Sequence, residues 1–115
     1  MLFYKGVLIS HLSEQYKPGT VTTNFNIAYV WYERISGRKK KGAARHVPHG
    51  ASCIIAIEYD GVLLEHAEFQ RYGIKEHERE NCWTSAAKDK AQINTVCKYR
   101  ILSNEEINNL YSIGV

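Results

Sequence analysis

Residues 53–57 read Cys-Ile-Ile-Ala-Ile, and this nearly continuous apolar run decides the fold. Such a run is typical of a strand buried on both faces, because both alternating sets of its side chains are apolar. Asp60-Gly61 then provides a two-residue turn that suits a type I′ hairpin, in which both residues have positive φ. We therefore predict that Val62 to Phe69 returns beside residues 53–57 as their hairpin partner.

Further strands are expected on either side of this pair. Residues 2–9 (LFYKGVLI) are rich in strand-forming residues, and Gly6 within them indicates a bulge or a close backbone approach. Residues 95–101 alternate as a last strand. Lys17-Pro18-Gly19 is a turn, because proline presets φ and glycine tolerates positive φ.

Three helices are expected from apolar spacing and capping residues, over residues 24–36, 85–93 and 103–112. Thr23 or Asn24 can cap the first helix, whose Ile27 and Trp31 we expect to pack on residues 53–57. Ser103-x-x-Glu106 is a capping box that opens the last helix. The sequence thus predicts one α+β domain over residues 1–115, with a small mixed or antiparallel sheet whose central strands span about 52–58 and 62–69.

Composition favours a cytoplasmic protein that folds as one unit. The chain has 115 residues, of which 44% are hydrophobic and 23% are charged, close to the average for globular proteins. It contains no apolar run near the roughly 20 residues that cross a bilayer, so no membrane contact is expected. Its 3 cysteines form no CxxC pair, which argues against a disulfide framework and against a thiolate metal site.

Positive charge is concentrated between Arg34 and His49, in a chain whose formal net charge is +3. Lys and Arg side chains that neutralise phosphates release counterions, so this stretch is a candidate nucleic-acid interface. A solvated charged loop is the alternative. His46-x-x-His49 resembles half of a metal site but lacks a third ligand, so no metal is predicted. The candidate nucleic-acid-binding residues are Arg38, Lys39, Lys40, Lys41, Arg45, His46 and His49.

A second candidate site is acidic. Glu76, Glu78 and Glu80 alternate, so an extended chain would put the three carboxylates on one side. Mutual repulsion raises one carboxyl pKa in such a group and can supply an acid or a charge stabiliser. An exposed acidic edge is the alternative.

The segments LFYKG, KPG, VTTN, NIAYVWYER and SCIIAIEYD follow one another over about residues 2–60. Their order resembles the N-terminal half of small ADP-ribosyltransferase-fold proteins. The resemblance implies NAD as cofactor and a late glutamate that stabilises the ribosyl cation. The implied cofactor-binding residues are Lys5, Thr22, Thr23, Tyr29 and Tyr32, and the implied catalytic residues are Lys5, Glu78 and Glu80.

The chemistry behind this resemblance is consistent, because departure of neutral nicotinamide leaves positive charge that a carboxylate stabilises in a water-poor site. Lys5 stands where the family has Arg or His, so the implied domain is active or degenerate. We expect it to act on a host macromolecule, as a small toxin or a phage or mobile-element factor. The alternatives are a nucleic-acid-binding protein or small ribonuclease that uses residues 34–49, and a non-enzymatic inhibitor that binds a host protein.

Overall fold

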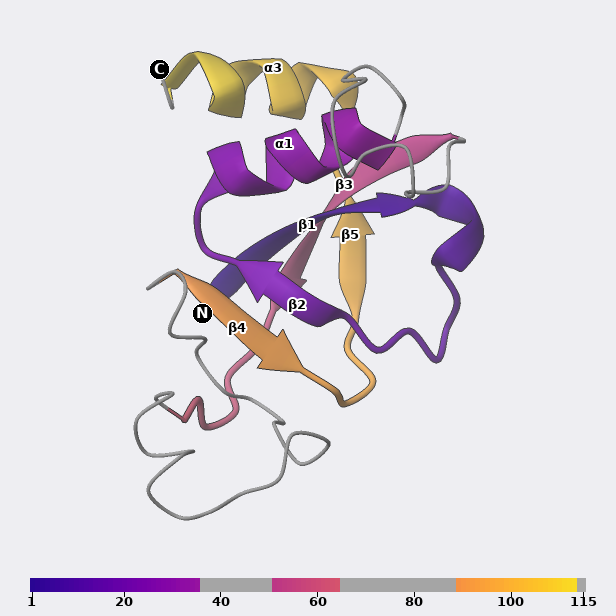
Figure 1. Ribbon diagram of the computed structural model, residues 1–115, viewed down its shortest axis with the longest axis vertical. Helices are drawn as coiled ribbons and strands as arrows, with labels where there is room; N and C mark the ends of the chain where they lie inside the picture. The colour runs from indigo at the N-terminus through magenta and orange to yellow at the C-terminus, as the bar shows by residue number, and fades with distance from the viewer. Residues whose placement is uncertain (36–50, 65–88, 114–115) are drawn as a thin grey trace.

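The computed structural model describes residues 1–35, 51–64 and 89–113 (Figure 1). Its elements are a 3-10 turn η1 (Ile9–His11), the helices α1 (Phe25–Ile35) and α3 (Asn104–Ile113), and five strands. The strands are β1 (Leu2–Leu8), β2 (Gly19–Thr22), β3 (Ser52–Glu58), β4 (Lys90–Ile93) and β5 (Tyr99–Ile101). The predicted α+β class is confirmed.

All five strands belong to one antiparallel sheet in the order β4-β2-β1-β3-β5. β1 and β3 pair along their whole length, from Leu2 opposite Glu58 to Leu8 opposite Ser52. The residues of the apolar run 53–57 are all buried, as their pattern predicts. β3 is buried because it has a strand on each side and packed side chains on each face.

The predicted hairpin partner of β3 is wrong. β1 pairs with one edge of β3, and β5 pairs with the other edge at residues 55–57, so residues 62–64 do not pair beside β3 as the hairpin requires. Val62 is 75% exposed, as expected of a residue that no buried strand includes. Residues 65–69 lie outside the described part of the chain. Asp60-Gly61 favours a turn locally, but the pairing of β3 is set by the long-range contact between the apolar strands β1 and β3.

α1 begins where the sequence predicts, and Asn24 rather than Thr23 caps it. The Asn24 Oδ1 atom accepts a hydrogen bond from the N–H of Asn26 at 3.0 Å, which satisfies one of the free amides of the first turn. The Thr22 hydroxyl accepts the N–H of Asn24 at 3.0 Å and fixes the chain just before the helix. The predicted helix end at residue 36 lies outside the described residues.

α1 crosses β1 at Gly6, where the two backbones meet. A Cβ atom at Gly6 would lie 2.7 Å from the carbonyl oxygen of Ala28 and 2.8 Å from the Cα of Tyr32. Real Cβ atoms do not approach other atoms so closely, so glycine is required by the packing. Of the two predictions for Gly6, the close backbone approach is confirmed.

The face of α1 that packs on the sheet differs from the predicted one. Phe25 and Ala28 are its buried residues, and they pack against Ile54 and Ala56 of β3. Ile27 and Trp31 are half-buried and lie on the flank of the helix, beside Lys90 of β4. The expectation that Ile27 and Trp31 pack on residues 53–57 is therefore corrected.

Residues 90–93 form strand β4, and the predicted helix over 85–93 is wrong there; residues 85–88 are not described. β4 pairs with β2 from Gly19 opposite Ile93 to Thr22 opposite Lys90. Ala91 and Ile93 are fully buried, whereas Lys90 and Gln92 between them are not. This alternation has the period of a strand, and it overrides the helical propensity of the segment.

α3 confirms the predicted helix over 103–112, and it lies beside α1 on the same face of the sheet (Figure 1). The Ser103 hydroxyl accepts the N–H of Glu106 at 3.1 Å, and Glu106 accepts the N–H of Ser103 at 3.2 Å. This reciprocal pair is the predicted capping box. Tyr111 stacks on Tyr29 of α1 with ring centroids 4.5 Å apart, which joins the two helices.

Candidate functional site

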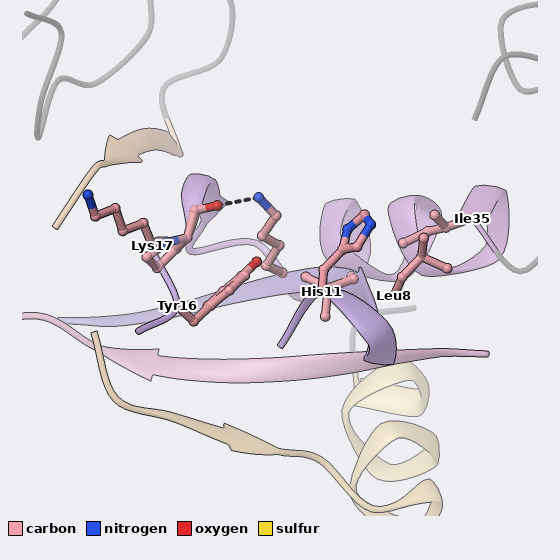
Figure 2. Close-up of a pocket in the computed structure, with 9 residues that line it drawn as sticks. Leu8, His11, Tyr16, Lys17 and Ile35 are labelled. Carbon is pink, nitrogen blue, oxygen red and sulfur yellow. Dashed lines mark hydrogen bonds between the residues drawn. The ribbon is translucent and has the colours of Figure 1, made fainter. Parts of the chain in front are cut away.

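The candidate site begins at a gap between β1 and β2. The two strands pair at Tyr4 and Thr22. Figure 1 shows that they separate beyond this point, toward the start of β2. Gly19 opens β2 with a φ of 70°, directly after the buried Pro18. The Lys5 ammonium reaches across the gap and donates a hydrogen bond to the carbonyl oxygen of Pro18 (Figure 2).

The position of Lys5 is electrostatically unfavourable. By strand alternation its side chain starts on the same face as the buried Phe3 and Val7. Burial lowers the pKa of Lys5 to about 8, because removal from water disfavours the charged form. Among the described residues, no carboxylate pairs with this ammonium. Its one hydrogen-bond acceptor there is the neutral Pro18 carbonyl, although an ammonium has three protons to donate.

Three open hollows follow one another along one flank of α1. Together we call them the α1 trough. The first, of about 290 Å³, runs from Asn26 to Arg34 on the helix. The second, of about 420 Å³, shares Trp31, Arg34 and Lys90 with the first. The third, of about 310 Å³, shares Lys5 and Ile35 with the second. The trough therefore follows α1 along nearly its whole length and then enters the gap at Lys5.

The trough is basic. Its described lining includes five side chains that can carry positive charge and no carboxylate. The basic residues are Lys5, His11, Lys17, Arg34 and Lys90. His11 and Tyr16 both line the third hollow, while the Lys17 side chain extends away from them (Figure 2).

An aromatic ring accompanies these cations. The half-buried Trp31 lines both of the first two hollows, and the ammonium of Lys90 lies over its ring, 5.8 Å from the centroid. This separation is within the range of a cation–π contact. A nucleotide can be contacted through its phosphate and through its base, and the neighbouring cations and the indole can make these two contacts.

The structure separates Lys5 from the threonines of the predicted NAD site. Lys5 lines the trough, whereas Thr22 is fully buried, lies opposite Tyr4 and lines none of the three hollows. The Thr23 backbone N–H donates to the carbonyl oxygen of Asp89 at 2.9 Å, an interaction that holds β2 to β4. Thr22 and Thr23 thus hold the start of α1 in place.

Tyr29 and Tyr32 also lie apart from Lys5. Both pack against the cluster of Phe25, Ala28 and Ile54 under α1. Their rings are 5.7 Å apart, and Tyr29 is covered by Tyr111 of α3. The described members of the predicted NAD site therefore do not converge on one cavity.

Other predicted site residues lie outside the described part of the chain. These are the catalytic candidates Glu78 and Glu80 and the nucleic-acid-binding candidates Arg38, Lys39, Lys40, Lys41, Arg45, His46 and His49. The ADP-ribosyltransferase-like activity stays a prediction.

Trp31 and Lys90 line the trough but are not among the candidate site residues predicted from the sequence. The helical spacing that Trp31 shares with Ile27 predicts a core position for it, and Lys90 falls within the helix predicted over residues 85–93. Lys5 had a signal of its own, because a lysine at the midpoint of an alternating Phe3-x-Lys5-x-Val7 pattern is expected on the buried face.

Comparison of the chain with protein-family models, with curated proteins and with solved structures gives no match. In residues 1–35, 51–64 and 89–113, no group of three His, Cys, Asp or Glu side chains could hold a metal ion. Neither described α-helix is both long enough and apolar enough to span a membrane. The trough is therefore interpreted from its own geometry.

Proposed function

We propose that the protein binds single-stranded nucleic acid, with the strand lying in the α1 trough. The observation that carries the proposal is the lining of the first two hollows. Trp31, Arg34 and Lys90 meet there with Lys5, and the described lining contains no carboxylate. A surface with only positive charges attracts phosphates, and its affinity falls as salt screens them.

The sequence extends this surface. Arg34 is the last basic residue of α1, and the basic stretch that begins at Arg38 follows within four positions. A nucleic-acid strand bound at Arg34 therefore contacts a residue that is only a few positions from Lys39, Lys40 and Lys41 in the sequence. We include that stretch in the proposed interface on the evidence of sequence alone.

Trp31 favours a single strand over a duplex. An indole can stack on a base only when that base is released from its own neighbours, and such stacking contributes about 1–3 kcal/mol per base. The open hollows on both sides of Trp31 leave room for bases beside the ring. A duplex would offer its phosphates to the cations but no base to the indole.

Fluorescence anisotropy with a labelled 10-nucleotide strand tests the proposal. We expect the affinity to fall linearly on a log-log plot against salt, with a slope of about −0.7 for each phosphate neutralised. Arg34→Ala and Lys90→Ala should each reduce the magnitude of this salt slope by about 0.7. Trp31→Ala should weaken binding roughly fivefold or more at every salt concentration, and Trp31→Phe should restore part of the loss.

Lys98→Ala is the matched control. Lys98 is an exposed lysine just before β5, at the opposite side of the sheet from β4, and it lines none of the three hollows. Its loss should leave both affinity and slope nearly unchanged. Equal effects of Lys98→Ala and Arg34→Ala would show non-specific attraction to a basic protein and would contradict the trough as the binding site.

A further inference from the structure

Lys5 lies where the second and third hollows of the α1 trough meet, because its side chain lines both. Arg34 and Lys17 are exposed, whereas Lys5 is partly buried between β1 and β2. A buried charge is costly unless a partner of opposite charge or several hydrogen bonds compensate it. In the described structure the Pro18 carbonyl is its single acceptor.

An anion that enters from the trough would supply such a partner. We propose that Lys5 is the centre of a subsite for a terminal phosphate, so that the protein prefers strands that end in a phosphomonoester. This proposal rests on the proposed function, because it identifies which part of the nucleic-acid strand binds in the gap between β1 and β2. The volume of the second hollow, about 420 Å³, is within the range of small-ligand pockets.

Charge favours a terminal over an internal phosphate. A phosphomonoester carries about −1.5 to −2 charges at neutral pH, against −1 for a phosphodiester, and it has three free oxygens. Arg34 and Lys90 line the same hollow as Lys5, so one dianionic group can meet more than one cation. The three free oxygens can accept hydrogen bonds from the ammonium protons that are not bonded to the Pro18 carbonyl. A phosphodiester has only two free oxygens and is linked to a nucleotide on each side.

The test compares three strands of one sequence, ending in a 5′-phosphate, in a 3′-phosphate or in hydroxyls at both ends. We expect one phosphorylated strand to bind the wild-type protein about tenfold more tightly than the hydroxyl strand, because hydrogen bonds between charged groups are stronger than those between neutral groups. Lys5→Met should abolish this preference. Lys5→Arg should keep part of it, and Lys98→Ala should keep all of it. Thermal unfolding of each variant shows whether it is folded.

The outcomes separate this proposal from the proposed function. Equal, tight binding of all three strands by the wild-type protein, with the trough variants still defective, overturns the phosphate subsite and leaves the nucleic-acid function standing. Weak binding of all strands overturns the function. In that case, titration with inorganic pyrophosphate followed by NMR of the Lys5 side chain decides the subsite: a saturable shift supports it, and an unchanged signal overturns it.

Discussion

Lys5 is a residue whose burial lowers the stability of the fold. Its ammonium lies among buried strands with the Pro18 carbonyl as partner, in a position where an apolar side chain would pack without a desolvation cost. The pKa shift from 10.5 to about 8 corresponds to roughly 3 kcal/mol of unfavourable burial, at 1.36 kcal/mol per unit. Residues that destabilise a fold in this way are concentrated at functional sites.

Replacing Lys5 with methionine should therefore stabilise the protein. Methionine keeps a similar length without the charge, so we expect the free energy of unfolding at pH 7 to rise by about 1–3 kcal/mol. Urea denaturation measures the change. A loss of stability in Lys5→Met would show that the ammonium is well compensated in the folded protein, contrary to this account.

The contribution of Lys5 to stability should also rise with pH between about 8 and 10. In this range the folded protein has released the Lys5 proton, because its pKa is lowered to about 8, while the unfolded chain still holds it. The unfolded state then binds more protons, so the free energy of unfolding increases with pH. The Met1 amino group and the Cys53 thiol, whose pKa values are raised, act with the opposite sign in this range, and Tyr16, whose pKa burial raises to about 12, does so above pH 10. These three groups are also present in Lys5→Met. From pH 7.5 to 9.5 the free energy of unfolding should therefore change more favourably in the wild-type protein than in Lys5→Met, and denaturation at the two pH values compares the proteins.

Gly6 and Gly19 make a matched pair of residues whose replacement should differ in cost. Gly6→Ala would place a Cβ 2.7 Å from the Ala28 carbonyl, a clash with backbone that only a shift of α1 can relieve, so we expect a loss of about 2–4 kcal/mol. A Cβ at Gly19 would have the Lys5 Nζ in ordinary van der Waals contact at 3.7 Å, so Gly19→Ala costs only its positive φ, about 1 kcal/mol. Similar losses in the two variants would contradict the close crossing of α1 over β1.

Among the elements, α3 is held at its start by the capping box, and this can be tested separately from the trough. Ser103→Ala removes the acceptor for the Glu106 N–H and should cost about 1 kcal/mol. Glu106 also pairs with Arg100 at 2.7 Å, and this pairing, with the Ser103 amide, lowers the pKa of its carboxyl. The contribution of Glu106 to stability is therefore present above the pKa of an unfolded glutamate and is lost as the pH falls through the lowered pKa of the folded protein. Thermal unfolding at pH 7 and pH 3 should show a smaller acid-induced drop in Glu106→Gln than in the wild-type protein.

The elements with local signals could be predicted from the sequence, and their pairing could not. Asn24 and the Ser103-Glu106 box mark α1 and α3, and the apolar run marks β3, because each signal lies within a few residues of its effect. The partners of β3 are set by burial against strands far away in the chain, which the local Asp60-Gly61 turn cannot indicate. Helical spacing likewise groups Ile27 with Trp31 but does not say which flank of α1 faces the sheet, so the trough residue Trp31 was assigned to the core.

For the whole molecule, the proposed interface combines the described trough with the basic stretch that follows α1 in sequence. Replacing Lys39, Lys40 and Lys41 together by alanine should weaken strand binding by similar factors for unrelated sequences, because phosphate contacts carry no sequence information. The salt slope should become shallower by up to about 2. The free energy of unfolding should change little if these charges are solvated, as surface charges contribute little to stability. An unaltered slope would remove the stretch from the interface.

The central claim is that a nucleic-acid strand lies against Trp31 in the α1 trough, and the indole N–H signal of Trp31 in a proton–nitrogen NMR spectrum tests it most directly. The chain has 2 tryptophans, and Trp31→Phe identifies the signal by its loss. On addition of a 10-nucleotide strand we predict a saturable shift of this signal and of the Lys90 amide, while the amide of Arg100 in β5 stays in place. A shift at Arg100 with the Trp31 indole unchanged would contradict the account.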